Sequence, residues 1–258
     1  MVSWSHGHME ILPRYFLEIA FDGTRFSGWQ NQPSDPSVQQ AMEAALRTVL
    51  REPHINVTGC GRTDSGVHAE QFFLHFDAST PMDERLLHSL NSLLPESIAV
   101  KRFWSVADNA HARFDATERG YVFRVHHQKD PFLADRSYHF RPALDVEAMN
   151  AGCGYLIGKQ DFTSFCKAGS DNKTMLCDVR KAEWRRTTVG EEFTIVADRF
   201  LRNMVRAIVG TCLRIGTGAE PPEHMRSVIK ALDRSAAGKA APACGLYLHR
   251  VSYPYIPQ

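Results

Sequence analysis

The order of strand and helix patterns in the first half of the chain restricts the possible fold most strongly. Alternating apolar residues in 14–22 predict a half-buried strand. An apolar stripe in 37–50, which starts with Ser37 and Gln40 at capping-box spacing, predicts a helix. Two strands, a second helix and a further strand are then expected over 54–60, 68–77, 82–94 and 98–107. The resulting order, β-α-β-β-α-β, is that of the ferredoxin-like unit.

The second half repeats this order with insertions, although the two halves share no visible sequence identity. The patterns predict a strand over 118–127, a helix over 145–158 and a hairpin over 177–200. A helix over 201–216, a short helix after Pro222 and a closing strand over 245–254 are expected to follow. The expected fold is therefore α+β, with two ferredoxin-like halves whose antiparallel sheets lie side by side. A cleft between such halves is a usual place for an active site.

The expected organisation has three parts. Residues 1–13 form an N-terminal extension that we exclude from the fold, residues 14–112 the first ferredoxin-like domain, and residues 113–258 the second, with insertions. The composition is that of an ordinary globular protein, with 43% hydrophobic and 23% charged residues. No stretch has the length and apolarity of a membrane span. A net charge of only +1 means that any RNA site must come from local clusters of Arg and Lys.

The cysteines and histidines give no support for a metal site. The six cysteines contain no Cys-x-x-Cys pair, and the twelve histidines form no ligand set at metal-binding spacing. We therefore expect no metal, and reduced, mostly buried thiols in a cytoplasmic protein. The chain also lacks a Gly-x-Gly-x-x-Gly sequence and a P-loop, and no nucleotide cofactor is expected.

The stretch VTGCGRTDSGVHAEQ, residues 57–71, places Asp64 in a glycine-rich loop. Thr-Asp-Ser-Gly is a good turn sequence by itself, because Asp and Ser bond to nearby backbone groups and Gly accepts positive φ. Asp-Ser-Gly is also the core tripeptide of aspartic proteases. That chemistry needs two carboxylates sharing a proton, and the chain has no second Asp-Ser-Gly or Asp-Thr-Gly. A protease would therefore need a partner chain.

Six separated motifs, in order, resemble those of the tRNA pseudouridine synthase A family. They are FDGTRFSGWQNQP (21–33), GRTDSGVHA (61–69), ATERGYVFRV (116–125), DFTSFCKAGSDNKT (161–174), RFLRNMVRAIVG (199–210) and APACGLYLHRVSYP (241–254). The resemblance covers nearly the whole chain after the first dozen residues. The departures are Ser65, where Ala is commoner, and ERGYVF in place of the usual Arg-x-Tyr-x-Tyr. Neither changes a residue that the chemistry needs.

The resemblance implies an isomerase that converts uridine to pseudouridine in the anticodon stem-loop of tRNA, at positions 38–40, as a homodimer and without a cofactor. It assigns the nucleophile to Asp64, because an ionised carboxylate can form the required intermediate. It matches Arg206 to the active-site arginine, Tyr121 to the active-site tyrosine and Leu246 to an apolar residue beside the base. From residues alone, Tyr121 and Leu246 are equally consistent with core strand positions.

Residues for RNA contact follow from charge and from the glycine-rich loops. Arg199, Arg202 and Arg206 have a spacing that predicts one basic face of the helix expected in this region. Gly61 and Gly66 allow the backbone to approach a flipped nucleotide closely. The candidates for substrate binding are Arg25, Trp29, Arg62, Thr63, Arg202 and Leu246.

A non-catalytic RNA-binding protein with tandem ferredoxin-like domains is the alternative from another functional class. It predicts exposed aromatic residues on the central strands of the sheet. It does not explain an Asp in a glycine-rich loop together with Arg206 and Tyr121.

Overall fold

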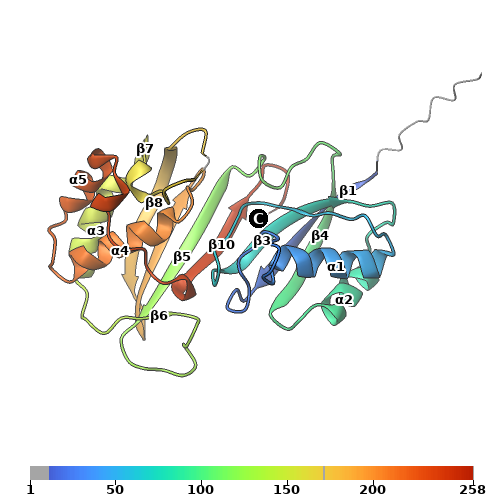
Figure 1. Ribbon diagram of the computed structural model, residues 1–258, viewed down its shortest axis with the longest axis horizontal. Helices are drawn as coiled ribbons and strands as arrows, with labels where there is room; N and C mark the ends of the chain where they lie inside the picture. The colour runs from blue at the N-terminus through green and yellow to red at the C-terminus, as the bar shows by residue number, and fades with distance from the viewer. Residues whose placement is uncertain (1–11, 171, 258) are drawn as a thin grey trace, which may run out of the picture.

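The computed structural model describes residues 12–170 and 172–257, so the expectation for the N-terminal extension falls almost entirely outside it. One mixed sheet of ten strands runs through both halves (Figure 1). The strands are β1 (Arg14–Phe21), β2 (Thr58–Gly59), β3 (His68–Asp77), β4 (Ile98–Val106), β5 (Glu118–His126), β6 (Tyr138–His139), β7 (Gly158–Asp161), β8 (Leu176–Arg186), β9 (Gly190–Ala197) and β10 (Leu246–Ser252).

The α-helices lie on one face of the sheet in two groups, and Figure 1 shows no helix crossing the middle strands β5 and β10. They are α1 (Val38–Leu50), α2 (Glu84–Leu93), α3 (Val146–Cys153), α4 (Met204–Gly216) and α5 (His224–Ala231). Each half has its own apolar core, and Tyr121 packs against both. In the part of the chain that the structure describes, no helix has the length and apolarity needed to cross a membrane.

Both halves have the same strand order, which confirms the predicted α+β fold. The first half runs β4-β1-β3-β2, and the second runs β10-β5-β9-β8 with β7 added at its edge. The final strand, β10, joins the halves. It pairs antiparallel with β5, and parallel with β3 through Tyr247 opposite His68 and Leu248 opposite Ala69.

The start of α1 follows the predicted capping. The Ser37 hydroxyl accepts a hydrogen bond from the Gln40 amide at 3.1 Å, which satisfies one of the free N–H groups of the first turn. Val38, Met42 and Leu46 are fully buried along the apolar stripe.

Two strand predictions need correction. Only Thr58–Gly59 of the expected strand 54–60 is a strand, because α1 side chains take the backbone bonds before it: Arg47 donates to the Ile55 carbonyl, and Glu43 accepts from the Val57 amide. The first strand is buried on both faces rather than one. Phe16 and Glu18 are 0% and 3% exposed, because the C-terminal aromatics and Arg102 cover the face without helices.

Candidate active site

The loop that carries Asp64 is held by backbone hydrogen bonds to the segment 26–29. The Phe26 carbonyl accepts from the Gly66 amide at 3.2 Å, and the Thr63 carbonyl accepts from the Trp29 amide at 3.4 Å. Gly28 has φ +90°, and a Cβ atom there would lie 2.2 Å from the Thr63 carbonyl oxygen. The two loops therefore pack backbone against backbone, which only glycine permits at this point.

Two arginines from the second half face the Asp64 carboxylate. Arg206 Nη1 lies 3.4 Å from Oδ2, and Arg202 Nε lies 3.8 Å from Oδ1. The exposed fraction of the side chain is 27% for Asp64, 21% for Arg206 and 58% for Arg202. Two cations therefore face one carboxylate, whereas in a protease dyad two carboxyl groups share one proton.

Arg206 is fixed in place by the segment 238–241. Its Nε donates to the Ala241 carbonyl at 2.7 Å, and the Ala241 amide donates back to the Arg206 carbonyl at 2.9 Å. Gly210 lets this segment lie directly on α4, since a Cβ atom there would be 1.8 Å from the Lys239 carbonyl oxygen. The guanidinium is thus oriented towards Asp64 by a backbone contact that sequence motifs do not reveal.

The predicted common helix face for the three arginines is wrong. The helix α4 starts at Met204, and Asn203 before it has φ +66° in the left-handed region. Arg199 and Arg202 therefore lie in the loop before the helix. The turn still carries Arg202 to Asp64, so the structure brings the two residues together by a different local geometry.

Tyr121 lies on β5 at the junction of the two cores, with its ring edge-on to Phe200 at 5.1 Å. Burial raises the pKa of the Tyr121 phenol, and the Cys60 thiol and the Asp64 carboxylate raise it further. The phenol therefore keeps its proton at neutral pH. Leu246 begins β10, is 5% exposed and belongs to the core of the second half.

The remaining candidates for RNA contact differ in accessibility. Arg25 and Arg62 are exposed. Thr63 has a buried hydroxyl with no hydrogen-bond partner within the described ranges. The expectation of a direct RNA contact by Trp29 is contradicted: its side chain is 4% exposed, and its ring is stacked on Phe72 at 4.3 Å. Its indole supports the loops around Asp64 from inside the core.

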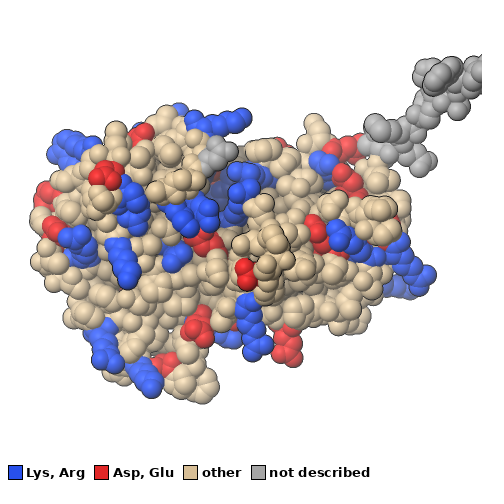
Figure 2. Space-filling view, viewed as in Figure 1, with Lys and Arg blue, Asp and Glu red and all other residues tan. Residues whose placement is uncertain are grey.

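Basic side chains gather on the helix-bearing face near the boundary between the halves (Figure 2). Arg206 belongs to α4 on this side of the sheet, and Tyr121 of β5 packs against the cores of both halves. Among residues 12–170 and 172–257, no group of three or more His, Cys, Asp or Glu side chains is arranged to hold a metal ion.

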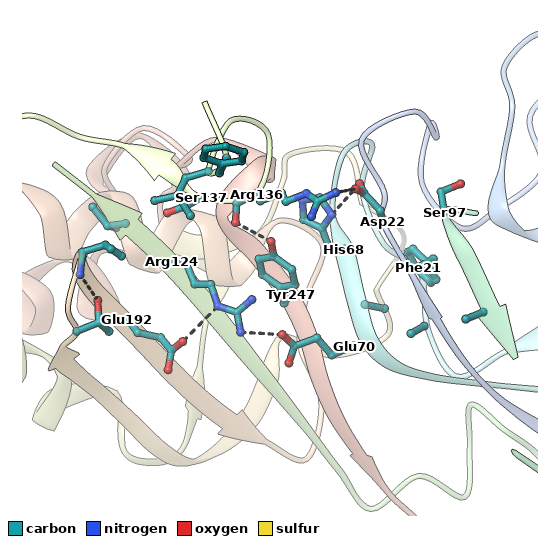
Figure 3. Close-up of a pocket in the computed structure, with 18 of the residues that line it drawn as sticks. Phe21, Asp22, His68, Glu70, Ser97, Arg124, Arg136, Ser137, Glu192 and Tyr247 are labelled. Atoms are coloured by element: carbon teal, nitrogen blue, oxygen red, sulfur yellow. Dashed lines mark hydrogen bonds and ion pairs between the residues drawn. The ribbon is translucent and has the colours of Figure 1, made fainter. Parts of the chain in front are cut away.

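A cavity of about 750 Å³ lies against the other face of the sheet (Figure 3). Five of its lining side chains are acidic and three are basic. Arg124 is paired with Glu70 at 2.7 Å and with Glu192 at 3.3 Å, and it lies over the Tyr247 ring. An acidic cavity whose central cation is already paired does not suit a phosphate backbone, so we do not place the RNA site there.

Comparisons with known proteins identify the family of the chain. The family model described as tRNA pseudouridine synthase matches residues 19–115 and 153–254. The tRNA pseudouridine synthase A of Porphyromonas gingivalis is 46% identical over 94% of this chain and 98% of its own. That of Parabacteroides distasonis is 46% identical over 93% and 96%, and that of Bacillus subtilis 41% identical over 91% and 97%. The chain belongs to the tRNA pseudouridine synthase family of isomerases.

Proposed function

We propose that this protein isomerises uridine to pseudouridine in the anticodon stem-loop of tRNA, at positions 38–40, with Asp64 as the nucleophile. The observation that carries the proposal is the position of the Asp64 carboxylate, 3.4 Å from the Arg206 guanidinium across the boundary between the halves. A cytoplasmic homodimer, in which one tRNA contacts both subunits, remains our prediction for the active form.

The reaction detaches uracil from its ribose, rotates the base and rejoins it through carbon. Attack on the base and attack on the sugar both require a carboxylate at this point, and the two arginines lie beside it. Tyr121 is protonated, because burial raises its pKa. It can stack on the pyrimidine, and its hydroxyl can take part in proton transfer when the new carbon–carbon bond loses its proton.

The structure offers no support for the non-catalytic RNA-binding alternative. That function predicts exposed aromatic residues on the central strands. Within the described residues, the exposed large aromatic side chains are Phe114, Phe132 and Tyr255, and all three lie outside the strands.

The first test is incubation of the purified protein with unmodified tRNA, followed by base-resolved mapping of pseudouridine. Replacing Asp64 by Asn should abolish detectable product, because an amide is not a nucleophile of this kind. Affinity for tRNA should change little, since phosphate contacts supply most of it.

Asp35→Asn is the matched control, because Asp35 is an exposed loop residue of the same half. It should leave both turnover and affinity unchanged. Turnover by Asp64→Asn within about tenfold of the unchanged protein would contradict the nucleophile assignment. Product at other tRNA positions would contradict the assignment of the anticodon stem-loop and leave the nucleophile in place.

A further inference from the structure

Arg119 joins four separate backbone positions through one guanidinium. Nη1 donates to the carbonyls of Ala116 and Asp198 at 2.7 and 3.0 Å. Nη2 donates to the carbonyls of Arg113 and Cys60 at 2.6 and 3.2 Å. Both terminal nitrogens thus use all their N–H groups on carbonyl oxygens.

Each of these carbonyls belongs to a segment that bears on the active site. Cys60 begins the loop that carries Asp64. Asp198 begins the loop that leads through Arg202 into α4. Arg113 and Ala116 lie in the connection between β4 and β5, which joins the two halves. The guanidinium therefore lies where the catalytic loop, the arginine-bearing loop and the connection meet.

Arg119 has no carboxylate partner within 4.0 Å among the residues that the structure describes, which sets it apart from an ordinary structural ion pair. It lies on β5 two residues before Tyr121, so the two side chains point to the same face of the sheet. Its positive charge also counteracts the effect of burial on the pKa of Tyr121.

We infer that Arg119 is a positioning residue, which holds the loop of Asp64 against the segment of Arg202 and Arg206 so that carboxylate and guanidinium face each other across the two halves. The inference rests on the proposed function for its catalytic consequence, and on the four hydrogen bonds for its structural one. A lysine ammonium cannot replace it, because three donors on one nitrogen do not reach four carbonyls placed around a planar fork.

The experiment compares Arg119→Ala and Arg119→Lys with the unchanged protein in single-turnover reactions on unmodified tRNA. A displaced catalytic loop should lower the rate at saturating enzyme by about a hundredfold. The enzyme concentration that gives half of the maximal rate should stay nearly unchanged. Added millimolar guanidinium should raise the single-turnover rate of Arg119→Ala by about tenfold, because the free ion can occupy the place of the missing side chain. Sodium chloride at equal ionic strength should not.

Arg14→Ala is the matched control. Arg14 is also a largely buried arginine that binds the β4–β5 connection, through the Ala110 carbonyl at 2.9 Å and an ion pair with Asp77. It does not touch the loop of Asp64. This variant should lose stability, keep the wild-type single-turnover rate and show no gain with guanidinium.

Hydrogen exchange tests the positioning role without reference to activity. The Gly66 amide donates to the Phe26 carbonyl, and the Val67 amide donates to the Asp64 carbonyl. Both amides should exchange faster in Arg119→Ala than in the unchanged protein or in Arg14→Ala. If Arg119→Ala does not fold, Arg119→Lys takes its place in both measurements. Wild-type rates together with unchanged exchange would overturn the inference. An inactive unchanged protein would overturn the proposed function alone, because exchange still decides the role of Arg119.

Discussion

At the residue scale, the two arginines beside Asp64 differ most in their contact with water. The side chain of Arg206 is 21% exposed and bonded to the Ala241 carbonyl, whereas that of Arg202 is 58% exposed and more distant from the carboxylate. Charge pairs that are shielded from water are screened less by solvent and salt. Arg206 is therefore suited to hold the carboxylate during the reaction, and Arg202 to bind phosphate at the edge of the site.

Substitution of each arginine by Met separates these roles, since Met removes the charge and keeps much of the stem packing. Arg206→Met should lower the single-turnover rate at saturating enzyme by about a hundredfold or more. Arg202→Met should weaken tRNA binding by about tenfold and leave that rate within a few-fold of normal. A wild-type single-turnover rate in Arg206→Met would place Arg206 among the surface residues and contradict its role in catalysis.

The placement of single residues was partly predictable. Asp64, Arg206 and Tyr121 stand in motifs whose order along the chain is recognisable. The structure pairs Asp64 with Arg206 and places Tyr121 where the cores of the two halves meet. The prediction that Trp29 contacts RNA was wrong, because an aromatic residue beside basic residues is typical both of an RNA contact and of a core position. Arg119 was missed, because the role inferred for it depends on backbone carbonyls of distant segments. Every residue has such a carbonyl, so no sequence pattern indicates which ones a side chain will contact.

At the element scale, the catalytic loop depends on close contact with its neighbouring loop. Gly28→Ala would place a Cβ atom 2.2 Å from the Thr63 carbonyl oxygen, at a φ of +90° that other residues rarely adopt. The variant should lose about 1–3 kcal/mol of unfolding free energy and most of its activity, because the loop must move. Urea unfolding and pseudouridine assays on the same preparation check both effects.

Gly61→Ala is the control within the loop, because a Cβ atom there meets nothing within 4 Å. It should keep normal stability. If RNA approaches the backbone at Gly61, as we predict, tRNA affinity should fall while the unfolding free energy stays constant. Equal loss of stability in both variants would contradict the role given to Gly28.

The elements show where the periodicity of apolar residues is enough to predict a helix or strand and where it is not. Ser37 and the apolar stripe after it specify α1, because cap and stripe act within one segment. The start of α4 was predicted three residues early, since Leu201 is buried like a helix residue although Asn203 breaks the helical backbone after it. Residues 54–57 look like a strand, yet Glu43 and Arg47 of α1 take their backbone bonds.

At the scale of the whole molecule, we expect a buried histidine to make the connection between the halves respond to pH. His75 on β3 is 6% exposed, and its Nδ1 accepts from the Ala112 amide of that connection at 3.1 Å. Burial, together with the nearby charges of Arg14 and His111, lowers the pKa of His75 to about 4. Between about pH 6.5 and that value, the unfolded chain binds a proton that the folded chain does not.

Unfolding free energy should therefore fall as pH falls through this window, by on the order of 2–3 kcal/mol for His75. His75→Asn keeps an acceptor near the Ala112 amide and cannot be protonated. It should be less stable at neutral pH, because it loses ring packing, and should show a smaller decline towards about pH 4. Urea unfolding across the window measures this, and parallel pH curves for the two proteins would contradict the assignment.

The central position of β10 affects how the protein is made. Its residues, 246–252, come last among the strands, yet they lie between β3 and β5. During synthesis the ribosome releases all the other strands first, and domains fold as their residues emerge. Until β10 follows, the exposed edges of β3 and β5 are open to pairing with other strands. Assembly of the active site therefore has to wait for this strand, and we expect the chain to have most need of a chaperone just before β10 is released.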